Sequence, residues 1–140
     1  MLSREGTAGE VLAGEKLWHI GHGDALALLQ ALADESADSL VTDPPAGINF
    51  MGRDWDNPYK YSAAGPGAVL PHLREREIFI WWLTEIMKEC FRVLKPGAHG
   101  LCWSLPRTSH WTGMAIENAG FEIIDQMDHI FSQGPNKSKS

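Results

Sequence analysis

The hydrophobic positions of the chain alternate between short runs and helical stripes. Apolar residues recur every three or four positions over 25–33, where Asp24 precedes them as a capping residue. Short apolar runs stand at 16–20 and 37–42. We therefore expect two strands there, joined by a helix over 25–33 into a βαβ unit with parallel strands.

The second half continues the alternation after a long segment rich in Gly, Pro and aromatic residues, which spans 46–71. Loops of this length in a compact domain are usually functional or disordered, and the aromatic content favours function. The pattern then predicts a helix, a strand, a second helix and a fourth strand or bent pair, at 73–94, 99–104, 108–119 and 121–131. The fold class is therefore α/β with a mostly parallel sheet.

Composition fits one domain over residues 15–131, with flexible polar tails at 1–14 and 132–140. Hydrophobic residues make up 44% of the 140 positions, and charged residues 21%. The longest apolar run, 78–83, is too short to span a bilayer, and 1–10 lacks the apolar core of a signal peptide. We expect a cytoplasmic protein without a membrane partner.

Charge and cysteine content exclude further classes of function. The formal net charge of −6 argues against tight autonomous binding of nucleic acid, although it leaves room for a local basic face. Cys90 and Cys102 are too far apart in sequence for a zinc knuckle or a disulfide framework. A metal site at His19, His22 and Asp24 is disfavoured, because a strand followed by a turn would point these side chains apart. We expect no metal.

The segment Asp43-Pro44-Pro45-Ala46 ends the apolar run at 37–42. Both prolines fix their own φ angle and push the preceding residues out of the helical region, so the chain leaving the strand is stiff. The Asp43 carboxylate and the Pro44 carbonyl would together form a double acceptor for an amino group. The alternative is a strand followed by a tight turn, with Asp43 as a cap.

Three polar residues follow predicted strands or the turns after them: Asp24, Asp43 and Ser104. In open parallel sheets, ligands bind outside the carboxyl ends of the strands. This convergence predicts a site at one edge of the sheet.

The order of several motifs resembles the DNA methyltransferases that modify exocyclic amino groups, over about residues 16–134. These enzymes use S-adenosylmethionine to form N6-methyladenine or N4-methylcytosine. Further segments resemble a subgroup frequent in phages and prophages. The matching segments are Gly23-Asp24, Val41-Thr42-Asp43-Pro44-Pro45, Arg92-Val93-Leu94-Lys95-Pro96-Gly97, 47–56, 106–111 and 117–122.

The resemblance implies a partial Rossmann-like fold, DNA as partner and a base flipped out of the duplex. It also implies a role in DNA methylation or restriction-modification, in a bacterial or phage-infected cell. Asp43 and Pro44 would accept the target amine, and Pro45 would hold their geometry. Asp24 and Asp43 would lie near the cofactor.

Two features depart from the pattern of these enzymes. Ala46 stands where they carry an aromatic residue that stacks on the flipped base. Phe50 and Trp55 are the candidates to replace it, although both residue types also pack in cores.

Arg107 and His110 could contact phosphate or base, or simply begin a solvated helix.

The second departure is the missing glycine-rich cofactor loop, which lies far downstream when Asp-Pro-Pro comes early. The segment that would read the DNA sequence is missing as well. We therefore expect the amino-terminal part of a methyltransferase, with an incomplete S-adenosylmethionine pocket and no activity alone. The alternatives are a non-catalytic relative that binds DNA or protein, or half of a split enzyme completed by a second chain or by self-association.

Overall fold

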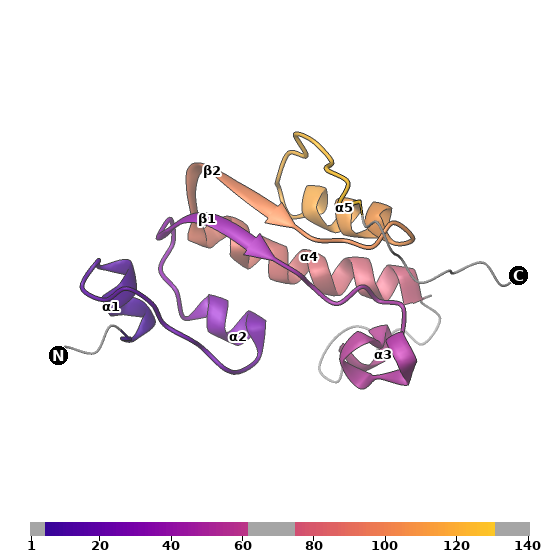
Figure 1. The fold of residues 1–140 in the computed structure, drawn as a ribbon, viewed down its shortest axis with the longest axis horizontal. Helices are drawn as coiled ribbons and strands as arrows, with labels where there is room; N and C mark the ends of the chain where they lie inside the picture. Colours follow the sequence, from indigo (N-terminus) through magenta and orange to yellow (C-terminus); the bar gives the residue numbers. More distant parts are fainter. Residues whose placement is uncertain (1–4, 62–74, 131–140) are drawn as a thin grey trace, which may run out of the picture.

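The computed structural model describes residues 5–61 and 75–130 of the chain. Figure 1 shows the order and arrangement of their helices and strands. They are α1 (Ala8–Leu12), α2 (Ala25–Gln30), β1 (Ala37–Thr42), the 3-10 helices η1 (Phe50–Gly52) and η2 (Asp54–Asp56), α3 (Pro58–Tyr61), α4 (Glu75–Val93), β2 (Leu94–Cys102) and α5 (Ser109–Asn118). No helix in this part of the chain is long and apolar enough to cross a membrane.

Strands β1 and β2 pair in parallel, with Leu40 opposite Gly100 and Thr42 opposite Cys102. Parallel neighbours need a long crossover, and α4 supplies it. In Figure 1 the two arrows point the same way along α4. The predicted strand at 37–42 is confirmed in its bounds. Of the strand predicted at 99–104, residues 99–102 form the later part of β2, whereas residues 103 and 104 lie beyond its end.

The strand predicted at 16–20 is wrong. This segment makes one isolated bridge, between Trp18 and Glu5, instead of a ladder. Leu17 and Ile20 are 70% and 72% exposed. A short apolar run becomes a strand only beside another strand, and the described residues provide none here. The parallel pair is therefore β1 and β2 joined through α4, and not the βαβ unit expected over 16–42.

The strand predicted at 121–131 is also not found, since residues 121–130 carry no regular element and residue 131 lies outside the described residues. Phe121 packs edge-to-face on Phe91, with ring centroids 5.1 Å apart. Ile124 and Ile130 remain exposed. Within 5–61 and 75–130, no strand lies beside these apolar residues to pair with them.

Residues 8–12, in the segment expected to be flexible, form α1. Thr7 caps it through a reciprocal pair of hydrogen bonds with Glu10. The capping residue predicted for the next helix is confirmed: the Asp24 carboxylate accepts the Ala27 N–H at 2.9 Å at the start of α2. The segment 132–140, also expected to be flexible, lies outside the described residues.

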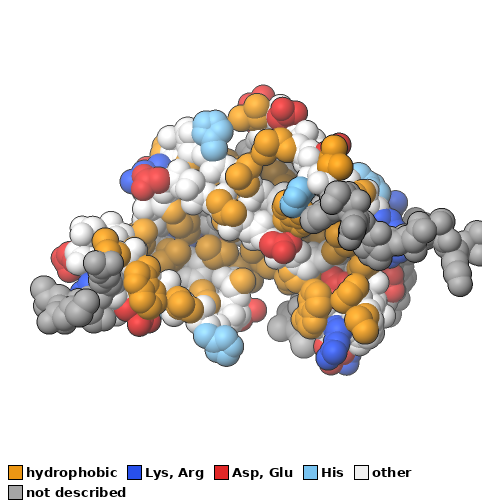
Figure 2. Space-filling view, viewed as in Figure 1, with side chains coloured by type: hydrophobic (Ala, Val, Ile, Leu, Met, Phe, Trp, Pro, Cys, Tyr) orange, Lys and Arg blue, Asp and Glu red, His pale blue; other side chains and the backbone are white. Residues whose placement is uncertain are grey.

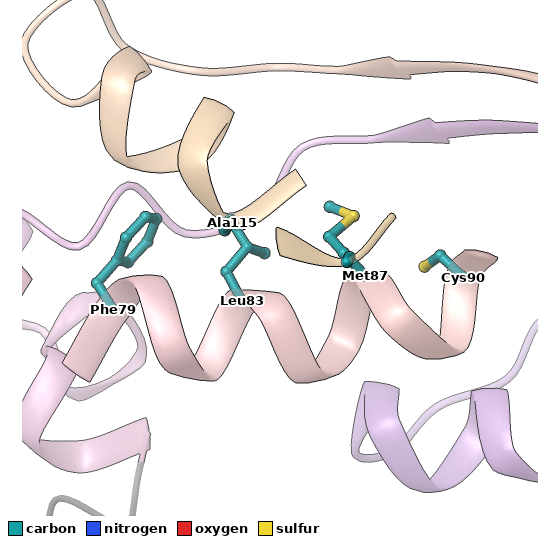
Figure 3. Packing of buried hydrophobic residues seen from close by; sticks show 6 residues of the cluster. Phe79, Leu83, Met87, Cys90 and Ala115 are labelled. Carbon is teal, nitrogen blue, oxygen red and sulfur yellow. The ribbon is translucent and has the colours of Figure 1, made fainter. Parts of the chain in front are cut away.

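The core is built along α4, as the helical stripe predicts. Phe79, Leu83, Met87 and Cys90 recur along one side of this helix, are buried, and form one cluster with Ala115 of α5 (Figure 3). Leu29, Leu40, Cys102 and Trp111 pack around them from the neighbouring elements. Helix α4 therefore holds α2, α3, α5 and one face of the sheet in place.

Arg92, near the end of α4, fixes the segment that leads into β1. Its guanidinium donates to the carbonyls of Leu29 and Leu32, both at 2.9 Å, and pairs with Asp34 and Glu89. The hydrogen bonds to Glu89 and Asp34 raise its pKa further, so it stays charged. These bonds tie the end of α2 and the start of β1 to the core helix.

Candidate active site at the carboxyl ends of the strands

Asp43 follows β1 directly, beside the residues that follow β2. The Trp103 N–H donates to the Thr42 carbonyl at 2.8 Å, so the two chains leave the sheet side by side. Asp43 is exposed, whereas Pro44 and Pro45 are half-buried. The carboxylate is thus accessible on a chain that two prolines hold stiff.

These residues line a cleft of about 370 Å³, which falls in the size range of small-molecule sites. Ser104, predicted to lie at the same edge as Asp43, lines the cleft with it. The lining residues are Asp43, Pro44, Pro45, Ala46, Ile48, Phe50, Trp55, Asp56, Trp103, Ser104, Leu105 and Thr112.

Aromatic residues line this cleft although position 46 carries none. Phe50 and Trp55 are 50% and 58% exposed, and their ring centroids lie 6.4 Å apart. Both residues come from the loop after Asp-Pro-Pro, as the sequence indicated. Their rings are not buried in the core, so the exposed ring surfaces can stack on a planar ligand.

Trp103 is a cleft residue that the sequence reasoning missed. It is 46% exposed and meets His129 edge-to-face, with ring centroids 5.5 Å apart. Its position next to Ser104, near the end of the strand predicted at 99–104, was the available signal. The parallel register that places it beside Asp43 becomes visible only in the structure.

Asp56 is the second missed residue, and it lies beneath the loop that carries the two aromatic residues. Its carboxylate is fully buried and accepts hydrogen bonds from the backbone N–H groups of Gly47 (2.7 Å), Ile48 (3.3 Å) and Phe50 (2.7 Å). Its carbonyl accepts the Asn49 N–H at 2.8 Å. One acidic residue therefore holds four consecutive backbone groups after Ala46.

Gly47 brings this loop against the core. Its φ angle is +69°, which glycine adopts without cost, and a Cβ at this position would lie 2.5 Å from the Phe79 ring. The loop consequently rests directly on α4, and the position of the cleft follows from the core.

The thiol nearest to Asp43 is not a nucleophile at neutral pH. Burial raises the pKa of Cys102 to about 11, and the neighbouring charges of Cys90 and Asp43 add to this effect. A protonated thiol does not attack an electrophile. The chemistry that this edge of the sheet offers is therefore that of hydrogen-bond acceptors and aromatic surfaces.

The other predicted substrate residues lie outside this cleft. His110 lines a groove of about 560 Å³ between α4 and α5, together with Trp81 and Lys88, and its ring contacts Trp111. Arg107 is exposed and lines neither the cleft nor that groove. The structure does not bring these two side chains to Asp43, and their contacts with DNA stay predictions.

Asp24, the predicted cofactor residue, is exposed and uses its carboxylate to cap α2. It lines neither of the two hollows described above. Leu17 and Ile20, shortly before it in sequence, are exposed. The residues described around Asp24 therefore do not fit an enclosed pocket for S-adenosylmethionine. Within the described ranges, no three His, Cys, Asp or Glu side chains form a group that could hold a metal ion.

The face of the molecule shown in Figure 2 carries few cationic groups that could bind a phosphate backbone. Figure 2 shows a face dominated by hydrophobic side chains, with few Lys and Arg groups. The exposed sheet residues Val41 and Leu101 are 80% and 54% exposed. The net charge of −6 agrees with this picture. Recognition of a ligand would thus depend on the cleft rather than on general attraction.

Comparison with known proteins finds two similar DNA methyltransferases. The chain is 37% identical over 82 residues to the DNA adenine methyltransferase YhdJ of Escherichia coli (strain K12), which is 59% of this chain and 23% of that protein. It is 34% identical over 77 residues to the type II methyltransferase M.BglII of Bacillus subtilis, which is 55% of this chain and 16% of that protein. No family model matches, and no solved structure gives a significant match. The similarity supports relationship to DNA methyltransferases, although it spans less than a quarter of either relative.

Proposed function

We propose that this chain carries the amine-binding part of a DNA methyltransferase site. The observation that carries the proposal is the exposed Asp43 carboxylate, held by Pro44 and Pro45 at the edge of a cleft with aromatic walls. The two similar methyltransferases support the reaction class. Asp43 and the Pro44 carbonyl would each accept one hydrogen of an exocyclic amine.

The chemistry of the amine explains the need for two fixed acceptors. The nitrogen lone pair of adenine N6 or cytosine N4 is delocalised into the ring, so this nitrogen is a weak nucleophile. Two acceptors that hold both hydrogens favour a pyramidal nitrogen and return the lone pair for attack on a methyl group. Acceptors that are rigid before the reaction stabilise the transition state without reorganising. The proton released from the amine would leave toward Asp43.

The base must leave the duplex to reach this cleft. Phe50, Trp55 and Trp103 line the cleft with partly exposed rings, in place of the aromatic residue that position 46 lacks. Stacking on aromatic side chains contributes about 1–3 kcal/mol per base. The relative from E. coli is named an adenine methyltransferase, which favours adenine N6 as the target.

The methyl donor in this proposal is S-adenosylmethionine, and the residues near Asp24 do not enclose it. We therefore infer that the chain binds the base and needs further surface to complete the cofactor site. The exposed apolar residues Val41 and Leu101 on the sheet favour completion by another part of the protein, by a second chain or by self-association. Calorimetry with S-adenosylmethionine at rising chain concentration tests self-association, because only that route would produce binding without another chain.

The decisive experiment isolates the amine. Duplexes with one unpaired adenine are compared with duplexes carrying purine at the same position, since purine lacks the amino group. We expect the wild-type chain to prefer adenine by roughly 10–100-fold, because hydrogen bonds to a charged group contribute about 1.5–3 kcal/mol. Asp43→Asn should lose this preference, whereas Asp54→Asn, an exposed carboxylate on the neighbouring loop, should keep it.

Methyl transfer is measured on the same preparations with tritiated S-adenosylmethionine. We expect no incorporation by the chain alone, and in any complemented enzyme a loss with Asp43→Asn on the order of 100-fold or more. Equal binding of adenine and purine by the wild-type chain would refute the proposed role of Asp43, as would full activity of Asp43→Asn.

A further inference from the structure

The loop after Asp-Pro-Pro is held by one buried carboxylate, that of Asp56. Buried carboxylates are costly unless hydrogen bonds satisfy them, and charge-assisted bonds to backbone N–H groups are among the strong ones. Here one oxygen accepts from Gly47, and the other accepts from Ile48 and Phe50. The arrangement fixes the course of the backbone between Ala46 and Phe50.

The backbone of this loop needs such support. Asn49 and Met51 have φ angles of +53° and +52°, in the left-handed region that residues other than glycine seldom adopt. Neighbouring residues with strained angles persist only where the surroundings impose them. The buried carboxylate supplies that constraint, since its acceptors require the N–H groups to converge from one side.

Two aromatic residues of the cleft, Phe50 and Trp55, depend on the same constraint. Phe50 donates its own N–H to Asp56, and Trp55 directly precedes Asp56 in η2. The rings of these two residues contact each other at the mouth of the cleft. Releasing the carboxylate would therefore free both rings at once.

We propose that Asp56 is the positioning residue of the base-binding cleft, acting by holding Phe50 and Trp55 in place to stack on the flipped base. The inference rests on the proposed function, because it names the surface that replaces the aromatic residue missing at position 46. Asp56 itself acts through the backbone, whereas the two rings contact the base.

The first measurement is amide hydrogen exchange of the wild-type chain, Asp56→Asn and Asp54→Asn. The asparagine amide can accept at only one of the two positions, so Asp56→Asn should raise exchange by on the order of tenfold or more either at Gly47 or at Ile48 and Phe50. Exchange along α4 should stay unchanged and shows that the fold is intact. Asp54→Asn should exchange like the wild-type chain.

The second measurement is affinity for the duplexes with one unpaired adenine or purine. Loss of stacking weakens both bases alike, so Asp56→Asn should lower both affinities roughly tenfold and keep the ratio between them. This pattern differs from that of Asp43→Asn, which should lower the affinity for adenine alone. Phe50→Ala and Trp55→Ala should weaken both bases while the three amides stay protected.

Each outcome decides the matter. Unchanged exchange in Asp56→Asn, or faster exchange with unchanged affinity, overturns the inference. If Asp56→Asn loses protection along α4 as well, the alanine variants decide: full affinity in both overturns the inference. A wild-type chain that binds neither duplex overturns the proposed function and this inference together. A wild-type chain that prefers adenine while Asp56→Asn binds like it overturns the inference alone.

Discussion

Two acidic residues, one beside the amine cleft and one predicted for the cofactor side, differ in how the chain holds them. Asp56, on the amine side, is fully buried and accepts three backbone N–H groups. Asp24, predicted for the cofactor side, is exposed and accepts a single N–H at 2.9 Å. The first shapes a cleft around Asp43, whereas the second caps a short helix among exposed apolar residues. The chain therefore builds its amine side from local contacts, and the described residues leave the cofactor side open.

Gly47 gives the sharpest probe of the amine side, because it presses the loop against Phe79. Gly47→Ala should cost about 2–4 kcal/mol of unfolding free energy, measured in urea. The left-handed φ angle of +69° accounts for about 1 kcal/mol of this loss. The Cβ contact at 2.5 Å from the Phe79 ring accounts for about 1–3 kcal/mol.

Gly52→Ala is the matched control. Gly52 has nearly the same φ angle, +67°, but a Cβ there would meet no atom within 4 Å. It should lose only the contribution of the backbone angle. Equal losses in the two variants would mean that the loop can move away from Phe79, and the amine side would then be no more rigid than the cofactor side.

Several element boundaries and the core helix could be predicted from the sequence, because residues within each element or next to it determine them. The two prolines after Asp43 stopped β1 at its predicted end, and Asp24 marked the start of α2. The apolar stripe of the helix predicted at 73–94 includes Phe79, Leu83 and Met87, which are buried, and also Phe91, which is 49% exposed. Each of these signals acts within one element or at its boundary.

The second probe compares the reactivity of a thiol on the amine side, Cys102, with that of a thiol introduced on the cofactor side. Burial raises the pKa of Cys102 to about 11, two pH units above its ordinary value of 9. Its thiolate fraction at pH 8 is then roughly 100-fold lower than that of a free thiol. In Leu17→Cys the new thiol would stand at a position that is 70% exposed on the cofactor side. We expect it to react with a disulfide reagent at least about tenfold faster than Cys102, because the greater nucleophilicity of a thiolate with a higher pKa offsets part of the difference in thiolate fraction.

The pH dependence of this reaction follows from the direction of the shift. The rate at Cys102 should keep rising toward pH 11, while that of an exposed thiol levels off near 9. Because the folded pKa is the higher one, the contribution of this thiol to stability is present below pH 9 and is lost as the pH rises through 11. Equal rates for the two thiols at pH 8 would show that the sheet edge beside Asp43 is as open as the segment around Leu17.

Features that depend on contacts across the chain escaped prediction. Trp103 enters the cleft only because β2 pairs with β1 in the register that sets Cys102 beside Thr42. Asp56 reads in sequence as one more acid in a polar loop, and nothing local reveals that it is buried under Gly47. The strands predicted from the apolar residues at 16–20 and 121–131 failed for the same reason. A strand needs a partner strand, and the periodicity of a segment does not identify one.

The smallest expected effect lies at Asp24, where capping and cofactor binding can be separated. Asp24→Ala removes the cap and should cost about 1 kcal/mol of unfolding free energy, whereas Asp24→Ser keeps a capping oxygen and should cost little. If Asp24 also binds S-adenosylmethionine, calorimetry on the complemented protein should show weaker cofactor binding in both variants, because serine restores the cap and not the carboxylate. Cofactor binding that is intact in Asp24→Ser would assign Asp24 to α2 alone. Asp24 would then make no contribution to cofactor binding, contrary to the role that the sequence resemblance assigned to it.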